Sequence, residues 1–198
     1  MNFKKILPLF VICSGAVFAG GETGEHFEGR KITKSELPKL IDADGKLKNA
    51  DYSEKESLVL INHNLGMEFN KTYPVIFEMK KQFTNLKVLD FSNNDVGNTE
   101  RGALMMYAES LGSFNELESV LLMENDFLKI DKDLFCIFIT KIVSKKLNFR
   151  LLFNSSELND GLKKILSTLG FTEQECGEMF MEQNLSVWVK GEENVTSY

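Results

Sequence analysis

Residues that could support acid–base, nucleophilic or metal chemistry are few in this chain of 198 residues. The histidines are His26 and His63, and the cysteines beyond the first nineteen residues are Cys136 and Cys176. The sequence contains no serine-hydrolase, zinc-protease, dithiol or phosphate-loop motif. A nucleophilic thiol at Cys136 would have to face solvent, whereas its neighbours Phe135, Ile137 and Phe138 predict burial. We therefore predict no catalytic residue and expect that the protein is not an enzyme.

No metal site and no cofactor site is predicted either. His26 stands among Glu22, Glu25 and Glu28, but a single imidazole in a segment rich in Gly and Glu is more typical of a solvated tail. We interpret His63 as a turn residue, because its place in the repeat described below accounts for it.

The dominant pattern is an apolar repeat with a period of 31 residues. It consists of Leu86-x-x-Leu89-x-Phe91-x-x-Asn94-x-Val96 followed by Leu117-x-x-Val120-x-Leu122-x-x-Asn125-x-Phe127. The same interval reaches Leu58, Leu60 and Leu65 on one side and Leu151, Phe153 and Leu158 on the other. A fixed period of this size is typical of solenoids. Over about residues 55–170 the chain resembles the leucine-rich repeat family, and most closely the ribonuclease-inhibitor-like subclass.

This resemblance implies an α/β fold: a short right-handed solenoid of four repeats, with parallel strands on the concave face and helices on the convex face. In such repeats the turn asparagine is structural, because its amide matches backbone groups left free where the chain leaves the sheet. We carry that role to Asn94 and Asn125 only. His63 and Ser156 occupy the equivalent positions of the outer repeats.

The segments between the strands carry helical patterning. Apolar residues at helical spacing predict helices over 103–111, 134–142 and 162–169, and a weaker one over 73–83. Strands that alternate with helices of this length predict right-handed crossovers and a parallel sheet. Phe171 to Gln183 then predicts a further helix, and Leu185 to Val189 a final strand in an atypical last unit.

Strand residues that point away from the helices are the candidate binding residues. They are Val59, Ile61, Asp90, Ser92, Leu121, Met123, Leu152 and Asn154. Five of these eight are apolar, which is more than a solvated sheet face normally carries. We interpret them as a partner-binding concave face. The alternative is that the N-terminal segment, or another copy of the protein, covers this face.

The amino-terminal segment of the chain predicts export. Lys4 and Lys5, the apolar run from Ile6 to Phe18 and the small residue Ala19 are typical of a secretory signal peptide over 1–19. We expect a flexible segment over 20–31, the repeat domain over 32–190 and a polar tail over 191–198. Loss of the two lysines changes the net charge from -6 to -8, that is, 21 basic against 29 acidic residues. This acidic balance argues against nucleic-acid binding.

The sequence thus predicts an exported, secreted or periplasmic protein that binds another protein through its concave face, without catalysis and without membrane attachment after cleavage. The alternatives are a structural or self-assembling exported protein and a small exported enzyme or inhibitor with an unrecognised site. The identity of the partner, the oligomeric state, pairing of Cys136 with Cys176 and glycosylation at the N-x-S/T triplets stay open.

Overall fold

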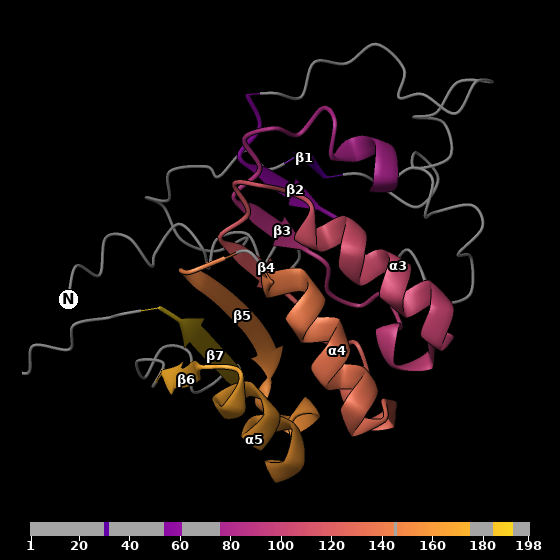
Figure 1. Cartoon of the computed structure of the whole chain (residues 1–198), viewed down its shortest axis with the longest axis vertical. Helices are drawn as coiled ribbons and strands as arrows, with labels where there is room; N and C mark the ends of the chain where they lie inside the picture. The colour runs from indigo at the N-terminus through magenta and orange to yellow at the C-terminus, as the bar shows by residue number, and fades with distance from the viewer. Residues whose placement is uncertain (1–29, 32–53, 61–75, 145, 175–183, 192–198) are drawn as a thin grey trace, which may run out of the picture.

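The computed structural model describes residues 30–31, 54–60, 76–144, 146–174 and 184–191. In these residues the chain is mixed α/β, built on a seven-stranded sheet with the order β1-β2-β3-β4-β5-β7-β6 (Figure 1). The first five strands pair in parallel, whereas β7 pairs antiparallel with both β5 and β6. The predicted α/β class and the mostly parallel sheet are therefore confirmed.

The elements follow the order expected for alternating strands and helices. The strands are β1 (Arg30–Lys31), β2 (Ser57–Val59), β3 (Val88–Asp90), β4 (Ser119–Leu121), β5 (Phe149–Asn154), β6 (Phe171–Gln174) and β7 (Leu185–Lys190). The helices are α3 (Arg101–Gly112), α4 (Lys132–Val143) and α5 (Asp160–Thr168), and residues 76–79 are also helical. Short 3-10 helices, η3 (Val96–Asn98), η4 (Phe127–Lys129) and η5 (Ser155–Glu157), follow β3, β4 and β5.

The 31-residue period of the sequence is also the register of the parallel strands. Leu58 pairs with Leu89, Leu89 with Val120, and Val120 with Leu151, so that each partner lies 31 residues further along the chain. Successive strand residues point to opposite faces, so residues two positions further along project to the same side. All members of both rows are buried: Leu58, Leu89, Val120 and Leu151, then Leu60, Phe91, Leu122 and Phe153.

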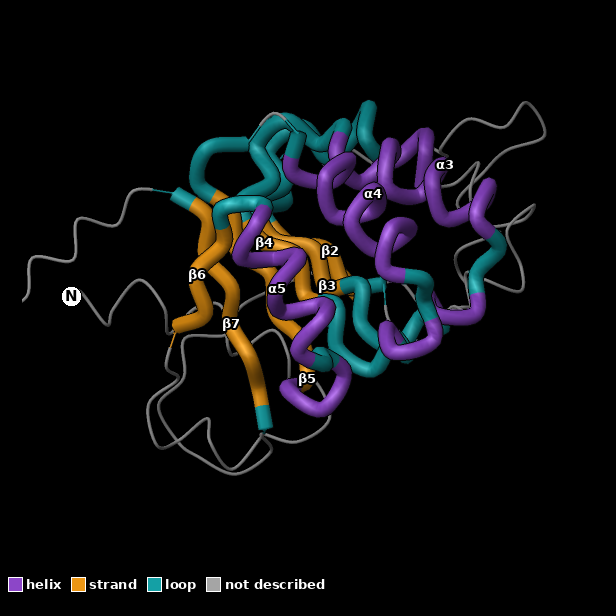
Figure 2. The backbone as a smooth tube through the Cα atoms, turned by 60° about the horizontal axis from the view of Figure 1, so that its bottom comes forward, coloured by secondary structure: helices purple, strands orange, loops and turns teal. Residues whose placement is uncertain are grey.

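The helices lie together on one face of the sheet (Figure 2). Buried apolar residues of the helices and of the strands form the main hydrophobic core. The apolar stripes predicted from the sequence are the buried ones: Leu104, Tyr107, Ala108 and Leu111 in α3, Phe135, Phe138, Ile139 and Ile142 in α4, and Leu162 and Leu166 in α5. The Phe127 ring lies edge-on to Phe135 and Phe153, with centroids 5.5 and 5.4 Å apart. These contacts join a turn, a helix and a strand in one core.

Side chains at two helix starts supply the caps that fix where the helices begin. The Asp131 carboxylate accepts hydrogen bonds from the backbone N–H groups of Asp133 and Leu134 at the start of α4. Asn159 accepts one from the N–H of Leu162 at the start of α5. Both caps satisfy backbone donors that have no partner inside the helix.

The predicted helix over 171–183 is wrong at its start, where Phe171–Gln174 forms strand β6. Gly170 has a φ of 86°, a conformation that ends α5 and turns the chain back toward the sheet. Phe171 is buried, and the segment pairs with β7. Sheet pairing therefore overrides the local helical pattern here. Residues 175–183 lie outside the described residues.

The final strand predicted over 185–189 is confirmed as β7, which runs antiparallel to β5. At the other end, Arg30 and Lys31 pair with Leu58 and Val59. The segment predicted to be flexible over 20–31 therefore ends in a strand. The predicted signal peptide over 1–19, the candidate residue Ile61, the turn residue His63 and most of the tail over 191–198 lie outside the described residues.

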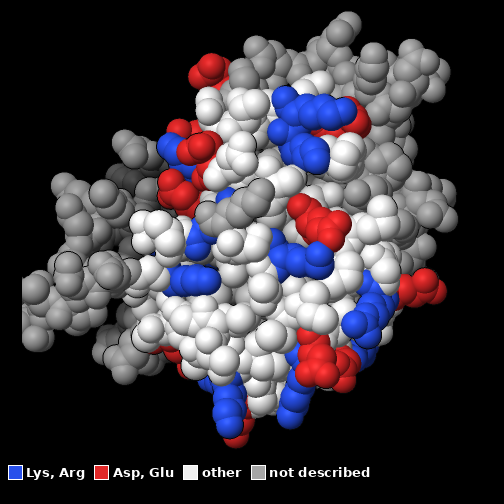
Figure 3. Space-filling model, viewed as in Figure 1, with Lys and Arg blue, Asp and Glu red and all other residues white. Residues whose placement is uncertain are grey.

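The surface over the helices carries acidic and basic side chains in close alternation (Figure 3). Two ion pairs connect neighbouring elements: Lys141 of α4 with Glu109 of α3, and Lys163 of α5 with Glu173 of β6 at 3.1 Å. Such partly exposed pairs contribute little to stability. This surface is typical of a solvated outer face.

Candidate functional site: the turn ladder and the helix-free face

Asn94 and Asn125 link the turns that follow β3 and β4. The Asn94 side-chain amide donates to the carbonyl oxygens of Leu60, at 2.5 Å, and of Ser92, at 3.2 Å. The Asn125 amide donates in the same way to Phe91, at 2.9 Å, and to Leu122, at 3.0 Å. The Asn125 side-chain oxygen also accepts from the N–H of Asn94 at 2.9 Å. Both side chains are fully buried, which agrees with a structural role.

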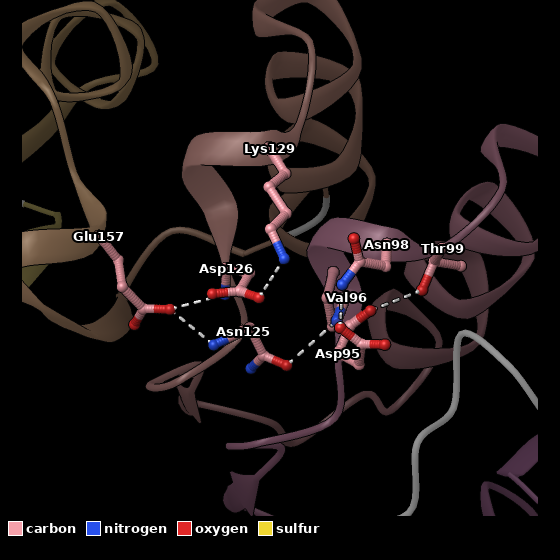
Figure 4. Close-up of polar contacts among 8 residues, drawn as sticks. All are labelled: Asp95, Val96, Asn98, Thr99, Asn125, Asp126, Lys129 and Glu157. Carbon is pink, nitrogen blue, oxygen red and sulfur yellow. Dashed lines mark hydrogen bonds and ion pairs between the residues drawn. The ribbon is translucent and has the colours of Figure 1, made fainter.

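Glu157 continues this ladder beyond Asn125. The repeat pattern of the sequence does not predict this role for Glu157. Its carboxylate accepts backbone N–H bonds from Asn125 at 2.6 Å and Asp126 at 2.8 Å (Figure 4). It also accepts one from Glu124 at 2.7 Å. The residue at the repeat position itself, Ser156, is exposed. In the sequence, the feature that could have indicated this role is that Glu157 directly precedes Leu158, which the apolar repeat predicts to be buried.

Burial of Glu157 affects its charge. Removal of the carboxyl group from water raises its pKa above the ordinary value of 4.5, against the opposing effect of the backbone N–H donors of Asp126, Glu124 and Asn125. Glu157 is 8% exposed. The turn after β4 is thus held by a buried carboxyl group.

Each of these turns contains two residues in the left-handed conformation. Asn93 and Asp95 have φ values of 53° and 58°, and Glu124 and Asp126 have values of 56° and 57°. These four side chains, with Asn154 and Glu157, surround an open hollow of about 460 Å³. Asp126 pairs with Lys129 at 2.7 Å. Among the described residues no group of three His, Cys, Asp or Glu side chains has an arrangement that could hold a metal ion.

The candidate binding residues lie on the face of the sheet opposite to the helices, which we call the helix-free face. One row of this face consists of Val59, Asp90 and Leu121 at the carboxyl ends of β2, β3 and β4 and Leu152 within β5, which are in register across the four strands. Val187 of β7 pairs with Leu152 and extends the same row. The predicted alternation of side chains is thus seen in the register.

Most of the described candidate binding residues are buried in the full chain, as in the alternative of a covered face. Leu121 and Leu152 are 0% exposed, as is Asp90, and Val59 and Ser92 are also buried. Met123 and Asn154 are partly exposed. A side chain on one face of a sheet loses all exposure only when further atoms pack over that face, and alternation in the sequence does not reveal such packing.

The helix-free face has its own apolar cluster, separate from the main core. Val59, Val88, Leu121, Leu152 and Val187 form it, with Met123 and Val189 packed against it. The sheet is therefore apolar on both faces, whereas a sheet with one solvated face has polar residues on that face.

Polar groups interrupt this cluster. The Asp90 carboxylate accepts the N–H of Ser92 at 3.1 Å. The hydroxyl oxygens of Ser92 and Ser119 are buried and have no hydrogen-bond partner among the residues that the structure describes. Arg150, which pairs with Ser119 across β4 and β5, is only partly buried. Buried hydroxyls without partners are uncommon in folded proteins, so this part of the face differs from ordinary core.

Two further hollows lie away from the turns. One, of about 340 Å³ between α4 and α5, is lined in part by Cys136, Lys132 and Lys164. Cys136 is a free thiol and is partly exposed, so the predicted burial of this residue is wrong. It lies at the edge of the buried stripe of α4. Cys176 lies outside the described residues.

The second hollow, of about 860 Å³, runs along the amino-terminal ends of β3 to β5 and the carboxyl end of β7, and its lining includes Lys87, Glu118, Lys146, Arg150 and Lys190. The Lys146 ammonium donates to the carbonyl oxygen of Phe114 at 2.6 Å, and desolvation lowers its pKa. Lys146 thus has a structural role.

Comparisons with protein-family models, with curated proteins and with solved structures find no match to this chain. Of the helices that the structure describes, none combines the length and the apolar character needed to cross a bilayer.

Proposed function

We propose that this chain is a short leucine-rich-repeat solenoid that is exported and binds another protein through the helix-free, concave face, without catalysis. The solenoid part of this proposal is supported by the 31-residue register of four parallel strands and by the asparagine ladder between their turns. In a repeat of this kind each unit packs only on its neighbours, and its strands form one continuous face.

The observation that carries the binding proposal is the second apolar cluster, formed by Val59, Val88, Leu121, Leu152 and Val187. The helices already cover the other face with the main core, so this cluster is not needed to seat them. An apolar patch in excess of the core is typical of surfaces that bind other proteins.

The binding proposal requires the apolar cluster to become accessible to the partner. A partner can contact Leu121 and Leu152 only when nothing else covers them, because both are 0% exposed in the full chain. The form to test is the expected exported chain, which starts at Gly20 after cleavage of residues 1–19.

The experiment is a pull-down from the compartment into which the protein is exported, with the chain from Gly20 as bait. Met123→Glu places a charge at the partly exposed end of the face. Leu128→Glu is the matched control, because Leu128 is 54% exposed and lies in η4, outside the apolar cluster. We expect Met123→Glu to lose a partner that the wild type and Leu128→Glu retain. Retention by all three proteins would contradict the proposal.

A further inference from the structure

The helix-free face is buried although the described helices lie on the other side of the sheet (Figure 2). Leu121 and Leu152 are 0% exposed, and so are their chain neighbours Leu122 and Leu151, which belong to the main core. Equal burial on the two faces of one strand requires atoms packed over both faces. The helices supply these atoms on one face only. The helix-free face therefore needs a cover of its own.

The burial extends across most of the sheet, which sets the size of this cover. The apolar cluster begins at Val59 of β2, which is 9% exposed, and ends at Val187 of β7, which is 8% exposed. Four strand spacings separate these residues in the order β2-β3-β4-β5-β7, a distance of about 19 Å at about 4.8 Å per spacing. A cover of this extent must be largely apolar, because the cluster beneath it consists of valine and leucine side chains.

We infer that residues 6–18, the apolar run of the expected signal peptide, cover the helix-free face in the uncleaved chain and keep a partner out until cleavage removes them. The inference rests on the proposed function, because it concerns access to the same binding face. It makes cleavage after Ala19 the step that switches binding on.

The attachment point of the run allows this placement. Arg30 pairs with Leu58 at the edge of the sheet, so the segment that ends at Arg30 is attached on the side where the apolar cluster begins. Residues 19–29, which join the run to Arg30, can span about 36 Å when extended. The run itself would be about 20 Å long as a helix, which is close to the width of the cluster. Both the reach and the length of the segment therefore suffice.

The composition of the run also fits the face. Residues 6–18 contain no charged side chain, whereas residues 20–29 are rich in Gly and Glu. An apolar cover removes apolar area from water on both of the surfaces that meet. Asp90, in the same row of the face, is 0% exposed, and a buried carboxylate is stabilised by a nearby cation. Lys4 and Lys5 directly precede the run and place such charges at its start.

Other segments outside the described residues fit this face less well. Residues 32–53 join β1 to β2 and residues 61–75 join β2 to β3, in the direction that β4 and β5 continue. Right-handed crossovers between such strands all pass on one side of the sheet, which is the side of α3 and α4 (Figure 1). Residues 175–183 join β6 to β7, and a loop of this length held at both ends reaches about 15 Å, short of Val59. Residues 192–198 are mostly polar.

The test compares solvent contact on the two faces of one strand. A specific protease site is inserted between Ala19 and Gly20, and the full chain is folded before it is cut and the released peptide is removed. NMR with a soluble gadolinium chelate then measures how strongly solvent contact broadens the methyl signals of Leu152. Leu151 is the matched control, because it is the adjacent leucine of β5, is equally buried and belongs to the main core.

Before cutting, we expect neither leucine to be broadened. After cutting, Leu152 should lose its protection and Leu151 should keep it. Continued protection of Leu152 after removal of residues 1–19 would overturn the inference, because the cover would then lie elsewhere in the chain. Broadening of both leucines would also overturn it, since the run would then support the fold rather than cover one face. Loss of Leu152 protection on dilution of the uncut chain would assign the cover to a second copy and would equally overturn it.

A point variant of the uncut chain checks the result without cleavage. Val11→Glu places a charge within the run and should expose Leu152, whereas Val195→Glu, the matched change in the polar tail, should not. An unchanged Leu152 signal in Val11→Glu would contradict the cover. None of these measurements uses a partner, so their failure is distinguishable from failure of the pull-down with Met123→Glu.

Discussion

Glu157 accepts the backbone N–H of Asn125 at 2.6 Å, just as Asn125 accepts the backbone N–H of Asn94 at 2.9 Å in the preceding turn. The carboxylate therefore takes the acceptor place of an asparagine and adds two further acceptor contacts, to Glu124 and Asp126. The ladder of turn hydrogen bonds ends on a charge, and this difference between neighbouring repeats has measurable consequences.

Glu157→Ala should lower the free energy of unfolding by about 2–3 kcal/mol, because it leaves backbone donors of a buried turn without an acceptor. The adjacent Ser156→Ala removes an exposed hydroxyl and should stay within about 0.5 kcal/mol of the wild type. Urea titration of both variants provides the measurement. Equal midpoints for the two variants would show that the carboxylate does not hold the turn.

The pH dependence of stability should carry a contribution from Glu157. Its folded-state pKa is raised by burial above 4.5, so the folded state holds this proton more tightly than the unfolded state. Stability from this group is therefore present below the unfolded pKa and is lost as the pH rises through the folded pKa. As the pH rises over that range, we expect the wild type to lose unfolding free energy relative to Glu157→Gln. A difference that changes in the opposite direction would mean that the backbone donors outweigh burial.

Asn94→Ala should destabilise the fold by about 1–3 kcal/mol, because the carbonyl oxygens of Leu60 and Ser92 lose their donor. Lys87→Ala removes only an exposed ion pair with Glu56 and should change stability by no more than about 0.5 kcal/mol. Denaturant titration compares them. Similar losses for both would contradict the assigned role of the turn asparagine.

Two glycines of α3 should respond in opposite directions to alanine. A Cβ at Gly112 would overlap the carbonyl oxygen of Lys141 in α4, and Gly112→Ala should cost about 1–3 kcal/mol. A Cβ at Gly102 has no atom within 4 Å, and Gly102→Ala should stabilise the helix by about 0.5–1 kcal/mol. Thermal unfolding of the two variants measures the difference, and a stabilising Gly112→Ala would show that α3 and α4 do not approach closely there.

The sheet and the main core could be predicted from the sequence because register and repeat period are the same quantity in parallel strands. Apolar residues at 31-residue intervals, such as Leu89 and Val120, pair directly. The apolar stripe of α4 from Phe135 to Ile142 could be predicted for a similar reason, because apolar residues on one face of a helix recur every three to four positions.

Other features depend on contacts that periodicity does not encode. Phe171 lies in a segment with helical patterning but pairs with β7, so the sheet decides its structure. Glu157 replaces an asparagine one position away from the repeat position, because a longer side chain reaches the same N–H groups. Burial of Leu121 depends on atoms packed over the face, which alternation along one strand does not reveal.

The most direct test of the central claim is site-specific photo-crosslinking from the helix-free face. A photoreactive phenylalanine analogue at Met123, in the chain from Gly20, places the probe at the partly exposed end of the apolar cluster. The same analogue at Leu128, which is 54% exposed outside this cluster, is the control. We predict a crosslink to one protein of the export compartment from Met123 and none to that protein from Leu128. A crosslink from Leu128 alone, or from neither position, would contradict binding through the helix-free face.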